Sequence, residues 1–230
     1  MRVLVIGAGG MVGRKLVDAL QAKGLPNGEE IESLTLFDIV APPPMAGAET
    51  LAGDLAGQGT AARLVASRPD LIFHLAAVVS GEAETDFRKG YRVNLDGTRE
   101  LLDAIRLEGL KQPYQPRLVF TSSIAVFGAP LPDVIPDDQQ LTPLTSYGTQ
   151  KAICELLIAD YTRKGLLDGI GIRLPTICVW PGRRRCCRSP TRSGTGTPRR
   201  GRRSASSSMP APWIPPRWAR AAASACPDWR

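Results

Sequence analysis

The sequence is poor in histidine and cysteine, and no part of it forms a long hydrophobic run. It has a single His, and its five Cys show no C-x-x-C spacing; they stand at positions 154, 178, 186, 187 and 226. This pattern excludes a Cys/His metal cage and a disulfide framework, so no metal is expected. No apolar run reaches the roughly 18–20 residues that span a bilayer, and the N-terminal segment lacks a signal-peptide pattern. These absences predict a protein that does not enter a membrane and works in the cytoplasm.

Acidic residues are nearly absent from the end of the chain. Residues 183–230 hold twelve Arg and one Asp, so the formal net charge of +7 conceals a mildly acidic body over residues 1–182. The same segment shows neither the period of a strand nor that of a helix. It is predicted to be a basic low-complexity tail without packed structure.

Two hypotheses explain this tail. One is a basic arm that binds nucleic acid by neutralising phosphates. The other, which we favour, is out-of-frame translation of a GC-rich gene, which yields Arg, Pro, Ala, Ser, Cys and Trp. If "RCCRSP" at 185–190 is written with GC-rich codons and read one base back, it becomes a strand-like run of valine, leucine and proline. Nucleic acid is accordingly not expected as a partner.

The body of the chain, residues 1–182, alternates β-branched runs with helical patterns. Expected strands are "RVLVIG", "SLTLFDI", "DLIFHLAA", "RLVFTSS" and "GIGIRLPTI", and expected helices cover 11–23, about 93–108 and about 147–163. Strands that alternate with helices in this way predict βαβ units and a parallel sheet covered on both faces. The fold class is therefore α/β, with a doubly wound parallel sheet of the Rossmann type over one domain.

A glycine-rich turn joins the first expected strand to the first expected helix. In "VLVIGAGGMVGRKLVDAL", Gly7, Gly10 and Gly13 are spaced G-x-x-G-x-x-G. Glycine permits the tight turn and a close approach to a pyrophosphate, while the helix N-terminus offers free N–H groups. The predicted dinucleotide site therefore includes the three glycines with Met11 and Val12 between them. The competing interpretation is a turn that only packs the helix on the strand.

An acidic residue ends the second expected strand. Asp38, in "TLFDI", lies where a carboxylate accepts hydrogen bonds from the ribose hydroxyls of a dinucleotide. No arginine follows it, since the next residues are "IVAPPP". A 2′-phosphate would meet an uncompensated carboxylate, so NAD is favoured over NADP.

Further strand ends supply walls for a cofactor, because ligands of open α/β sheets bind at the carboxyl ends of strands. "AGDLAG" follows a further, third short strand and is suited to an adenine edge and face, and "HLAA" then ends the fourth strand; the residues concerned are Asp54, Leu55, Leu75, Ala76 and Ala77. The only histidine, His74, lies inside the apolar run "LIFHLAA". We interpret it as a hydrogen-bonded core or wall residue rather than as a catalytic one.

A tyrosine and a lysine stand four positions apart in "TSYGTQK". On a helix, Tyr147 and Lys151 point from one face. A tyrosine becomes a base near neutral pH only if its pKa falls by about 3 units, roughly 4 kcal/mol, which nearby positive charges can supply. Ser122 and Ser123 in "FTSSIAVFG" offer a group to hold a substrate hydroxyl, and Ser123 is the first choice. The alternative is an ordinary surface helix.

Together these residues resemble the extended short-chain dehydrogenase/reductases, which include NAD-dependent epimerases and dehydratases. The resemblance covers about 1–182 and rests on the glycine turn, "GDL" at 53–55, "HLAA" at 74–77, "VN" at 93–94, "TSSIAVFG" at 121–128, "YGTQK" at 147–151 and "RLP" at 173–175. The stretch "PDDQQLTPLTSYGTQKAICELLIADYTRKGLLDG" is similar to the D-erythronate dehydrogenase subgroup, which oxidises four-carbon sugar acids with NAD.

The resemblance implies a role for each residue. Tyr147 would be the general base, Lys151 would bind the nicotinamide ribose and depress the tyrosine pKa, and Ser123 would orient the hydroxyl. Asn94 would support the active-site backbone or a water molecule, and Pro175 would lie beside the nicotinamide. Asn94 and Pro175 therefore join the expected cofactor site. The resemblance also implies a homodimer formed by the two long helices; the alternative is that each helix only buries one apolar stripe on the sheet.

Family members continue past "RLP" with a substrate-binding subdomain, which the tail of this chain does not resemble. The resemblance therefore implies an NAD-binding protein with weak or absent turnover. The leading hypothesis is an NAD-dependent dehydrogenase of a small, D-erythronate-like sugar acid. The alternatives are a nucleotide-sugar epimerase or dehydratase that retains its NAD, and a catalytically silent NAD-binding protein.

Overall fold

The computed structural model describes residues 1–136 and 138–177, and the predictions for 183–230 lie outside them. Residues Met1–Ile177 form one unit. Its strands are β1 (Arg2–Ile6), β2 (Ser33–Asp38), β3 (Ala48–Ala52), β4 (Leu71–His74), β5 (Arg117–Ser123) and β6 (Asp168–Leu174). Its α-helices are α1 (Met11–Lys23), α2 (Thr60–Val65), α3 (Ser80–Thr85), α4 (Phe87–Gly90), α5 (Gly97–Lys111) and α6 (Ser146–Arg163).

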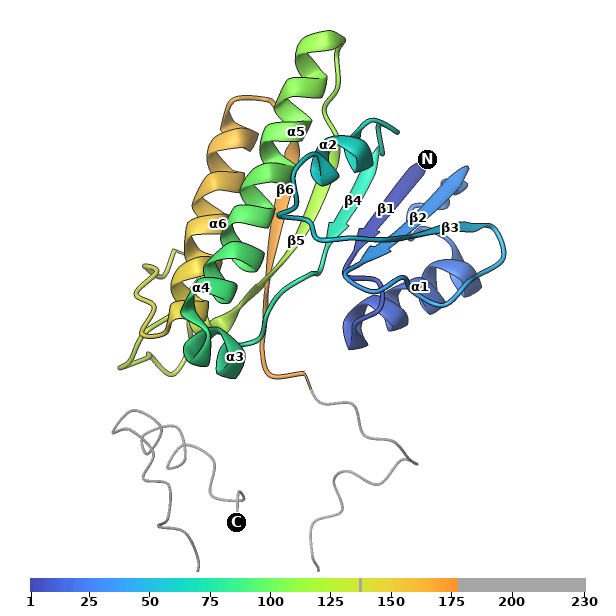
Figure 1. Ribbon diagram of the computed structural model, residues 1–230. Coiled ribbons are helices and arrows are strands. Elements are labelled where there is room, and N and C mark those ends of the chain that lie inside the picture. Colours follow the sequence, from blue (N-terminus) through green and yellow to red (C-terminus); the bar gives the residue numbers. More distant parts are fainter. Residues whose placement is uncertain (137, 178–230) are drawn as a thin grey trace, which may run out of the picture. The chain divides into compact units, whose positions relative to one another are not determined.

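The strands form one parallel sheet in the order β3-β2-β1-β4-β5-β6 (Figure 1). The chain starts in the middle at β1, moves outward to β3, and then returns to β4 on the other side of β1. The direction therefore reverses between β1 and β4, where open α/β sheets bind their ligands. This arrangement confirms the expected doubly wound parallel sheet of the Rossmann type.

Helices cover both faces of the sheet, and β1 is accordingly apolar on both sides. Leu4 and Ile6 belong to a core cluster with residues of α2, α5 and α6. Val3 and Val5 belong to a second cluster that includes Val17 of α1. Successive strand residues point to opposite faces, so an unbroken run of apolar residues is the pattern of a doubly covered strand.

The expected helices are found with changed starts and with additions. The helix expected at about 93–108 begins as a π-helix, η1 (Tyr91–Asp96), and continues as α5. Short helices that periodicity did not predict precede it (α3 and α4), and a 3₁₀ turn, η2 (Ile124–Val126), follows β5. The additions lie beside the carboxyl ends of the strands, where they shape the walls of the candidate site.

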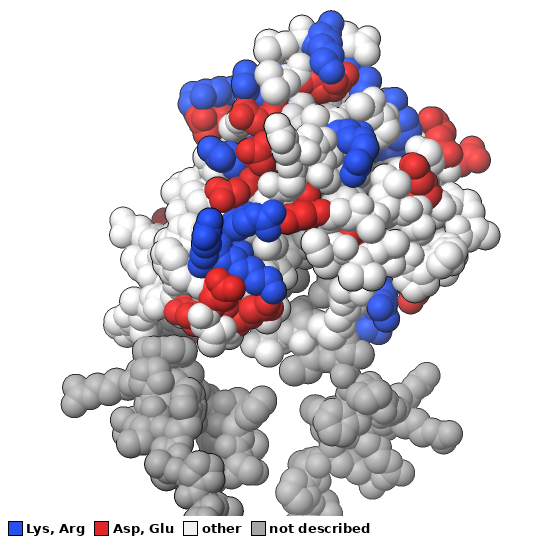
Figure 2. All heavy atoms as spheres, viewed as in Figure 1, with Lys and Arg blue, Asp and Glu red and all other residues white. Residues whose placement is uncertain are grey.

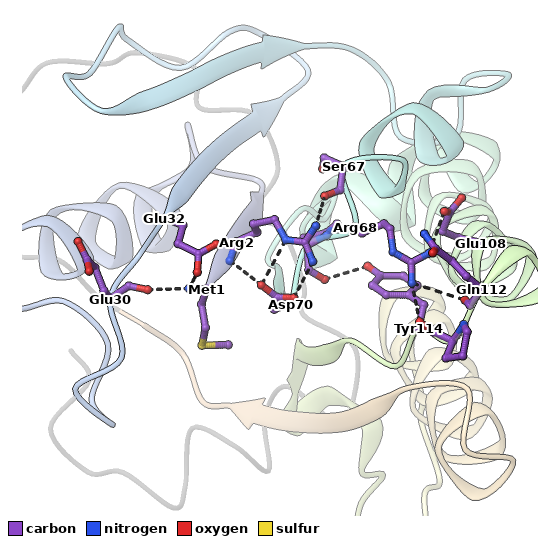
Figure 3. Close-up of polar contacts among 12 residues, drawn as sticks. Met1, Arg2, Glu30, Glu32, Ser67, Arg68, Asp70, Glu108, Gln112 and Tyr114 are labelled. Carbon is purple, nitrogen blue, oxygen red and sulfur yellow. Dashed lines mark hydrogen bonds and ion pairs between the residues drawn. The ribbon is translucent and has the colours of Figure 1, made fainter.

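Polar contacts join the elements at the amino end of the sheet (Figure 3). Arg2 of β1 donates from its backbone N–H to Asp70 at 2.7 Å and pairs with the same carboxylate at 3.0 Å. Arg68 pairs with Glu108 of α5 at 3.0 Å, and its guanidinium lies 4.6 Å from the ring centroid of Tyr114. These contacts join the start of β1 to the segment before β4, and that segment to α5. They lie at the end of the sheet opposite the carboxyl ends of the strands.

One strand of the sheet is exposed on the face opposite α6. A Cβ at Gly169 of β6 would meet Ile158 of α6 at 2.4 Å, so this glycine faces the helix. The neighbouring Ile170 and Ile172 point the other way and expose 48% and 44% of their surface. This apolar surface at the edge strand has no helix over it within the described part of the chain.

Candidate active site

A continuous crevice runs across the carboxyl ends of the strands. A cavity of about 790 Å³ lies over β2, β3 and β4, and a cavity of about 340 Å³ lies over β5 and the start of α6. The two share Gly7, Gly10, Leu75 and Ala77. The glycine turn therefore stands at the middle of one long site, at the switch point of the sheet.

The backbone of the glycine turn packs so tightly against its neighbours that Gly7 and Gly13 leave no room for a side chain. Gly7 has φ +89°, and a Cβ there would lie 2.5 Å from the backbone N of Ala76. A Cβ at Gly13 would lie 2.1 Å from the carbonyl oxygen of Gly7. Gly10 caps α1 without a side-chain hydrogen bond, so the first N–H groups of this helix are available to an anion. The turn fits a pyrophosphate, and it also packs α1 on β1.

The carboxylate of Asp38 is held against this turn. It accepts hydrogen bonds from the backbone N–H groups of Gly9 at 2.8 Å and Ile39 at 2.7 Å. Asp38 also lines the larger cavity. A carboxylate oxygen has further lone pairs, so the group can still accept hydroxyl hydrogens from a ligand.

The far end of the larger cavity lies between the end of β3 and η1. Leu55 is buried, and Asp54 accepts a hydrogen bond from the backbone N–H of Ala56 at 3.0 Å. Asp54 also forms an ion pair with Arg92 of η1. Sequence reasoning missed Arg92, because an arginine in an amphipathic segment carries no sign of which distant carboxylate it will meet.

His74 lies below the crevice as a core residue. It is 1% exposed, and its Nε2 is 2.9 Å from the hydroxyl oxygen of Thr98, which in turn donates to the carbonyl of Asn94 at 2.7 Å. Burial, with a contribution from the charge of Lys151, lowers the pKa of His74 to about 3. A histidine so strongly held neutral is no proton shuttle near pH 7, so its interpretation as a core residue is confirmed.

The smaller cavity brings together Ser123, Tyr147, Lys151 and Pro175. Burial raises the pKa of Tyr147, and a hydrogen bond with Ser123 lowers it. This contact supports Ser123 over its neighbour Ser122, which is 3% exposed and whose hydroxyl has no partner among the described residues. The serine and the tyrosine can therefore hold one substrate hydroxyl between them.

Lys151 is almost fully buried, and its side chain extends from α6 to the end of β5. Its ammonium donates to the carbonyl of Thr121 at 2.8 Å and lies 5.8 Å from the ring centroid of Tyr147. Burial lowers the pKa of Lys151 to about 8. In the protein alone, burial outweighs the hydrogen bond with Ser123 and raises the pKa of Tyr147, and Lys151 is not among the causes of this shift. The expectation that Lys151 depresses the tyrosine pKa concerns the site with its cofactor and stays a prediction.

Asn94 is buried behind Val78, which lines the larger cavity. It is 2% exposed; its Oδ1 accepts from the backbone N–H of Val78 at 2.8 Å, and its Nδ2 donates to the carbonyl of Val78 at 3.0 Å. The same Nδ2 donates to Gln150 at 2.7 Å. The implied support of the backbone is found, and Asn94 is not among the residues that line the two cavities.

The other expected site residues all line the crevice. They are Gly7, Gly10, Met11, Val12, Gly13, Asp38, Asp54, Leu55, Leu75, Ala76, Ala77, Ser123, Tyr147, Lys151 and Pro175. Among the described residues, no group of three or more His, Cys, Asp or Glu could hold a metal ion. The same part of the chain contains no helix long and apolar enough to cross a membrane.

Comparison with known proteins gives matches over the same part of the chain. The model of the NAD dependent epimerase/dehydratase family matches residues 3–183. A D-erythronate dehydrogenase of Cupriavidus necator is 45% identical over 200 residues, which cover 84% of this chain and 60% of that protein. The chain thus spans about 60% of the length of this curated relative.

Two solved structures are similar in both sequence and fold. The nucleoside-diphosphate-sugar epimerase from Agrobacterium tumefaciens is 61% identical with a TM-score of 0.76, over 80% of this chain and 55% of that one. The UDP-glucose 4-epimerase from Brucella ovis in complex with NAD is 28% identical with a TM-score of 0.63, over 75% of this chain and 51% of that one.

Proposed function

The chain belongs to the NAD dependent epimerase/dehydratase family, and from this premise we propose that it binds NAD and acts as a dehydrogenase. The substrate is a small, D-erythronate-like sugar acid, of which one hydroxyl is oxidised. The observation that carries the proposal is the single crevice that joins the glycine turn to Ser123, Tyr147 and Lys151. The 45% identity to a D-erythronate dehydrogenase supports the choice of substrate class.

The residues of the crevice fit NAD. The N–H groups at the start of α1 would hold the pyrophosphate, where any Cβ at Gly7 or Gly13 would collide with backbone atoms. Asp38 would accept hydrogen bonds from the ribose hydroxyls of the adenosine half, and Asp54 and Leu55 would face the adenine. A 2′-phosphate on that ribose would meet the carboxylate of Asp38, so NAD is preferred to NADP.

The reacting end of the site divides the work among three side chains. NAD, when bound, supplies the hydride acceptor and a positively charged ring. Ser123 orients the substrate hydroxyl, and the phenolate oxygen of Tyr147 takes its proton and becomes the neutral phenol. Lys151 binds the nicotinamide ribose, and its ammonium stabilises the tyrosine phenolate.

Burial lowers the pKa of Lys151 to about 8, so the ammonium is the main form at neutral pH and loses its proton as the pH rises past that value. Ribose hydroxyls near Nζ would favour the charged form, which in turn would favour the phenolate of Tyr147.

The homologous epimerase at 61% identity supports an alternative function with the same residues. An epimerase or dehydratase uses Ser123, Tyr147 and Lys151 but retains its NAD, so no NADH accumulates. A catalytically silent NAD-binding protein would bind NAD and transform neither kind of substrate. These outcomes differ in one observable, the net formation of NADH.

The test is an assay of the whole chain over a panel of four-carbon hydroxy acids with NAD and NADP. Formation of NADH from D-erythronate-like acids, abolished in Tyr147→Phe, supports the dehydrogenase. Conversion of UDP-glucose without NADH would favour the epimerase. NAD binding without any turnover would favour the silent protein.

The outer surface of the long helices supports a homodimer. Leu107 and Leu110 of α5 expose 50% and 73% of their surface, and Leu156 of α6 exposes 64%. These helices lie side by side on one face of the sheet (Figure 1). Pairing of α5 and α6 with a second copy would cover these leucines, and light scattering of the purified chain tests it. The proposed place of action is the cytoplasm.

A further inference from the structure

An ion pair closes the adenine end of the crevice. Arg92 of η1 and Asp54 after β3 come from opposite walls of the larger cavity, which both residues line. Figure 2 shows basic and acidic side chains intermingled on the surface over α3 and α4, next to this end of the site. The pair joins these two sides of the cavity through their side chains.

Asp54 is fixed by contacts at both of its carboxylate oxygens. Oδ1 accepts from the backbone N–H of Ala56 at 3.0 Å, and Oδ2 pairs with the guanidinium of Arg92. The Asp54 side chain is 26% exposed, so without these partners it would sample several rotamers in contact with water. The bond to Ala56 fixes the carboxylate within its own loop, while only Arg92 fixes it relative to the opposite wall.

We propose that Arg92 is the residue that positions Asp54 for recognition of the adenine ring. Adenine carries a hydrogen-bond donor, the 6-amino group, and a carboxylate held in place is a matched acceptor for it. This inference rests on the proposed binding of NAD in this crevice. Arg92 acts through Asp54, so its contribution depends on the base at that end and not on the pyrophosphate or nicotinamide.

Other basic residues line the same cavity without this geometry. Lys89 pairs with Glu82 at 2.5 Å on the surface formed by α3 and α4. Arg88 lines the cavity from α4, but the ion pair with Asp54 belongs to Arg92. Arg88→Gln removes the same charge from the same wall and is a matched control for Arg92→Gln.

The test compares NAD with nicotinamide hypoxanthine dinucleotide, in which a carbonyl replaces the 6-amino group. Dissociation constants are measured by calorimetry on the whole chain. Arg92→Gln is expected to raise the dissociation constant of NAD about fivefold, the equivalent of about 1 kcal/mol. The dissociation constant of the hypoxanthine analogue should change by less than about twofold. Arg88→Gln is expected to leave the ratio of the two constants unchanged.

A double-mutant cycle tests whether Arg92 acts through Asp54. In the Asp54→Asn background, Arg92→Gln should cause no further loss of NAD affinity, since the group that it positions has been replaced. Additive losses would overturn the inference, and so would an equal loss for both dinucleotides. If the unmodified chain binds neither dinucleotide, the proposed function fails as well; if it binds NAD and only the ratio is insensitive to Arg92, the inference alone fails.

Discussion

Asn94 and Gln150 meet below the crevice through a hydrogen bond of 2.7 Å from Asn94 Nδ2 to Gln150 Oε1. Asn94 is 2% exposed and Gln150 is 0% exposed, and 56 positions separate them in the chain. Asn94 also makes two hydrogen bonds to the backbone of Val78, which lines the cofactor crevice. Because Gln150 directly precedes Lys151, this contact joins the wall after β4 to the helix of the reacting residues.

Replacement of Gln150 by Leu should destabilise the protein. The leucine leaves one hydrogen of Asn94 Nδ2 without its acceptor in a buried site, which costs about 1–3 kcal/mol. Urea denaturation measures the free energy of unfolding. Gln140→Leu, at an exposed position, is the control and should change this free energy by less than about 0.5 kcal/mol. Equal stability of the two variants would show that the Asn94–Gln150 contact contributes nothing.

Acidification should destabilise the fold through His74. Its pKa is about 3 in the folded chain, below the ordinary value of 6.5, so the unfolded chain takes up a proton that the folded chain does not. The stabilising contribution is complete above pH 6.5 and is lost as the pH falls from there towards 3. Between pH 6 and 5 the free energy of unfolding should decrease by about 1.4 kcal/mol per pH unit from this group.

The histidine contribution can be isolated because the chain has only one His. The unfolding free energy of His74→Gln, followed over the same pH range, gives the slope due to all other groups. The difference between the two slopes of unfolding free energy against pH should be close to the value for one proton, about 1.4 kcal/mol per pH unit. Parallel curves for the two proteins would mean that His74 is protonated in the folded state.

Loss of the Arg68 side chain should weaken the amino end of the sheet. Its guanidinium donates to Glu108 at 3.0 Å and to the carbonyl of Pro113 at 2.6 Å, and it lies over the ring of Tyr114. The Arg68 and Glu108 side chains are only 17% and 11% exposed, so Arg68→Ala removes a shielded ion pair and leaves Glu108 with Lys111 alone. A loss of about 2 kcal/mol is expected in thermal or urea unfolding.

The matched control for this prediction is Arg163→Ala. Arg163 pairs with Asp160 at the end of α6, where its side chain is 72% exposed. Exposed pairs contribute little, so the control should lose less than about 0.5 kcal/mol. NAD affinity should be unaffected in both variants, because neither arginine lines the crevice. A loss of NAD affinity in Arg68→Ala would show that the two ends of the sheet are coupled.

Tyr147→Phe should separate binding from chemistry. The phenyl ring keeps the packing in the smaller cavity but has no oxygen to take the substrate proton. Dissociation constants for NAD should change by less than about threefold, while any measurable turnover should fall by about 100-fold or more. Retained turnover in this variant would remove the tyrosine from the reaction.

The parts of the site that depend on residues close together in the sequence could be predicted from the sequence. The glycine spacing around Gly7, the end of β2 at Asp38 and the four-residue interval from Tyr147 to Lys151 are local patterns with a direct geometric meaning. The sheet then brings them together, because carboxyl ends of parallel strands lie on one edge. All of these residues line the crevice in the structure.

The contacts that local patterns do not determine were missed. Gln150 and Arg92 each depend on a partner at least 38 positions away, which only the tertiary fold selects. The bonds of Asn94, in the π-helix, to Val78 and Gln150 likewise follow from the fold and not from a local pattern. The pKa of Tyr147 could not be predicted, because it depends on how deeply the phenol is buried and where the lysine points.

The crevice between the glycine turn and Tyr147 is proposed as a site for NAD. Titration of the whole chain with NADH and NADPH, followed by nicotinamide fluorescence, tests this binding without any turnover, with Asp38→Ala as a second sample. One saturable NADH site per chain is expected, about tenfold tighter than for NADPH, and this preference should be lost in Asp38→Ala. A folded chain that binds neither nucleotide, or that binds NADPH as tightly as NADH, would contradict it.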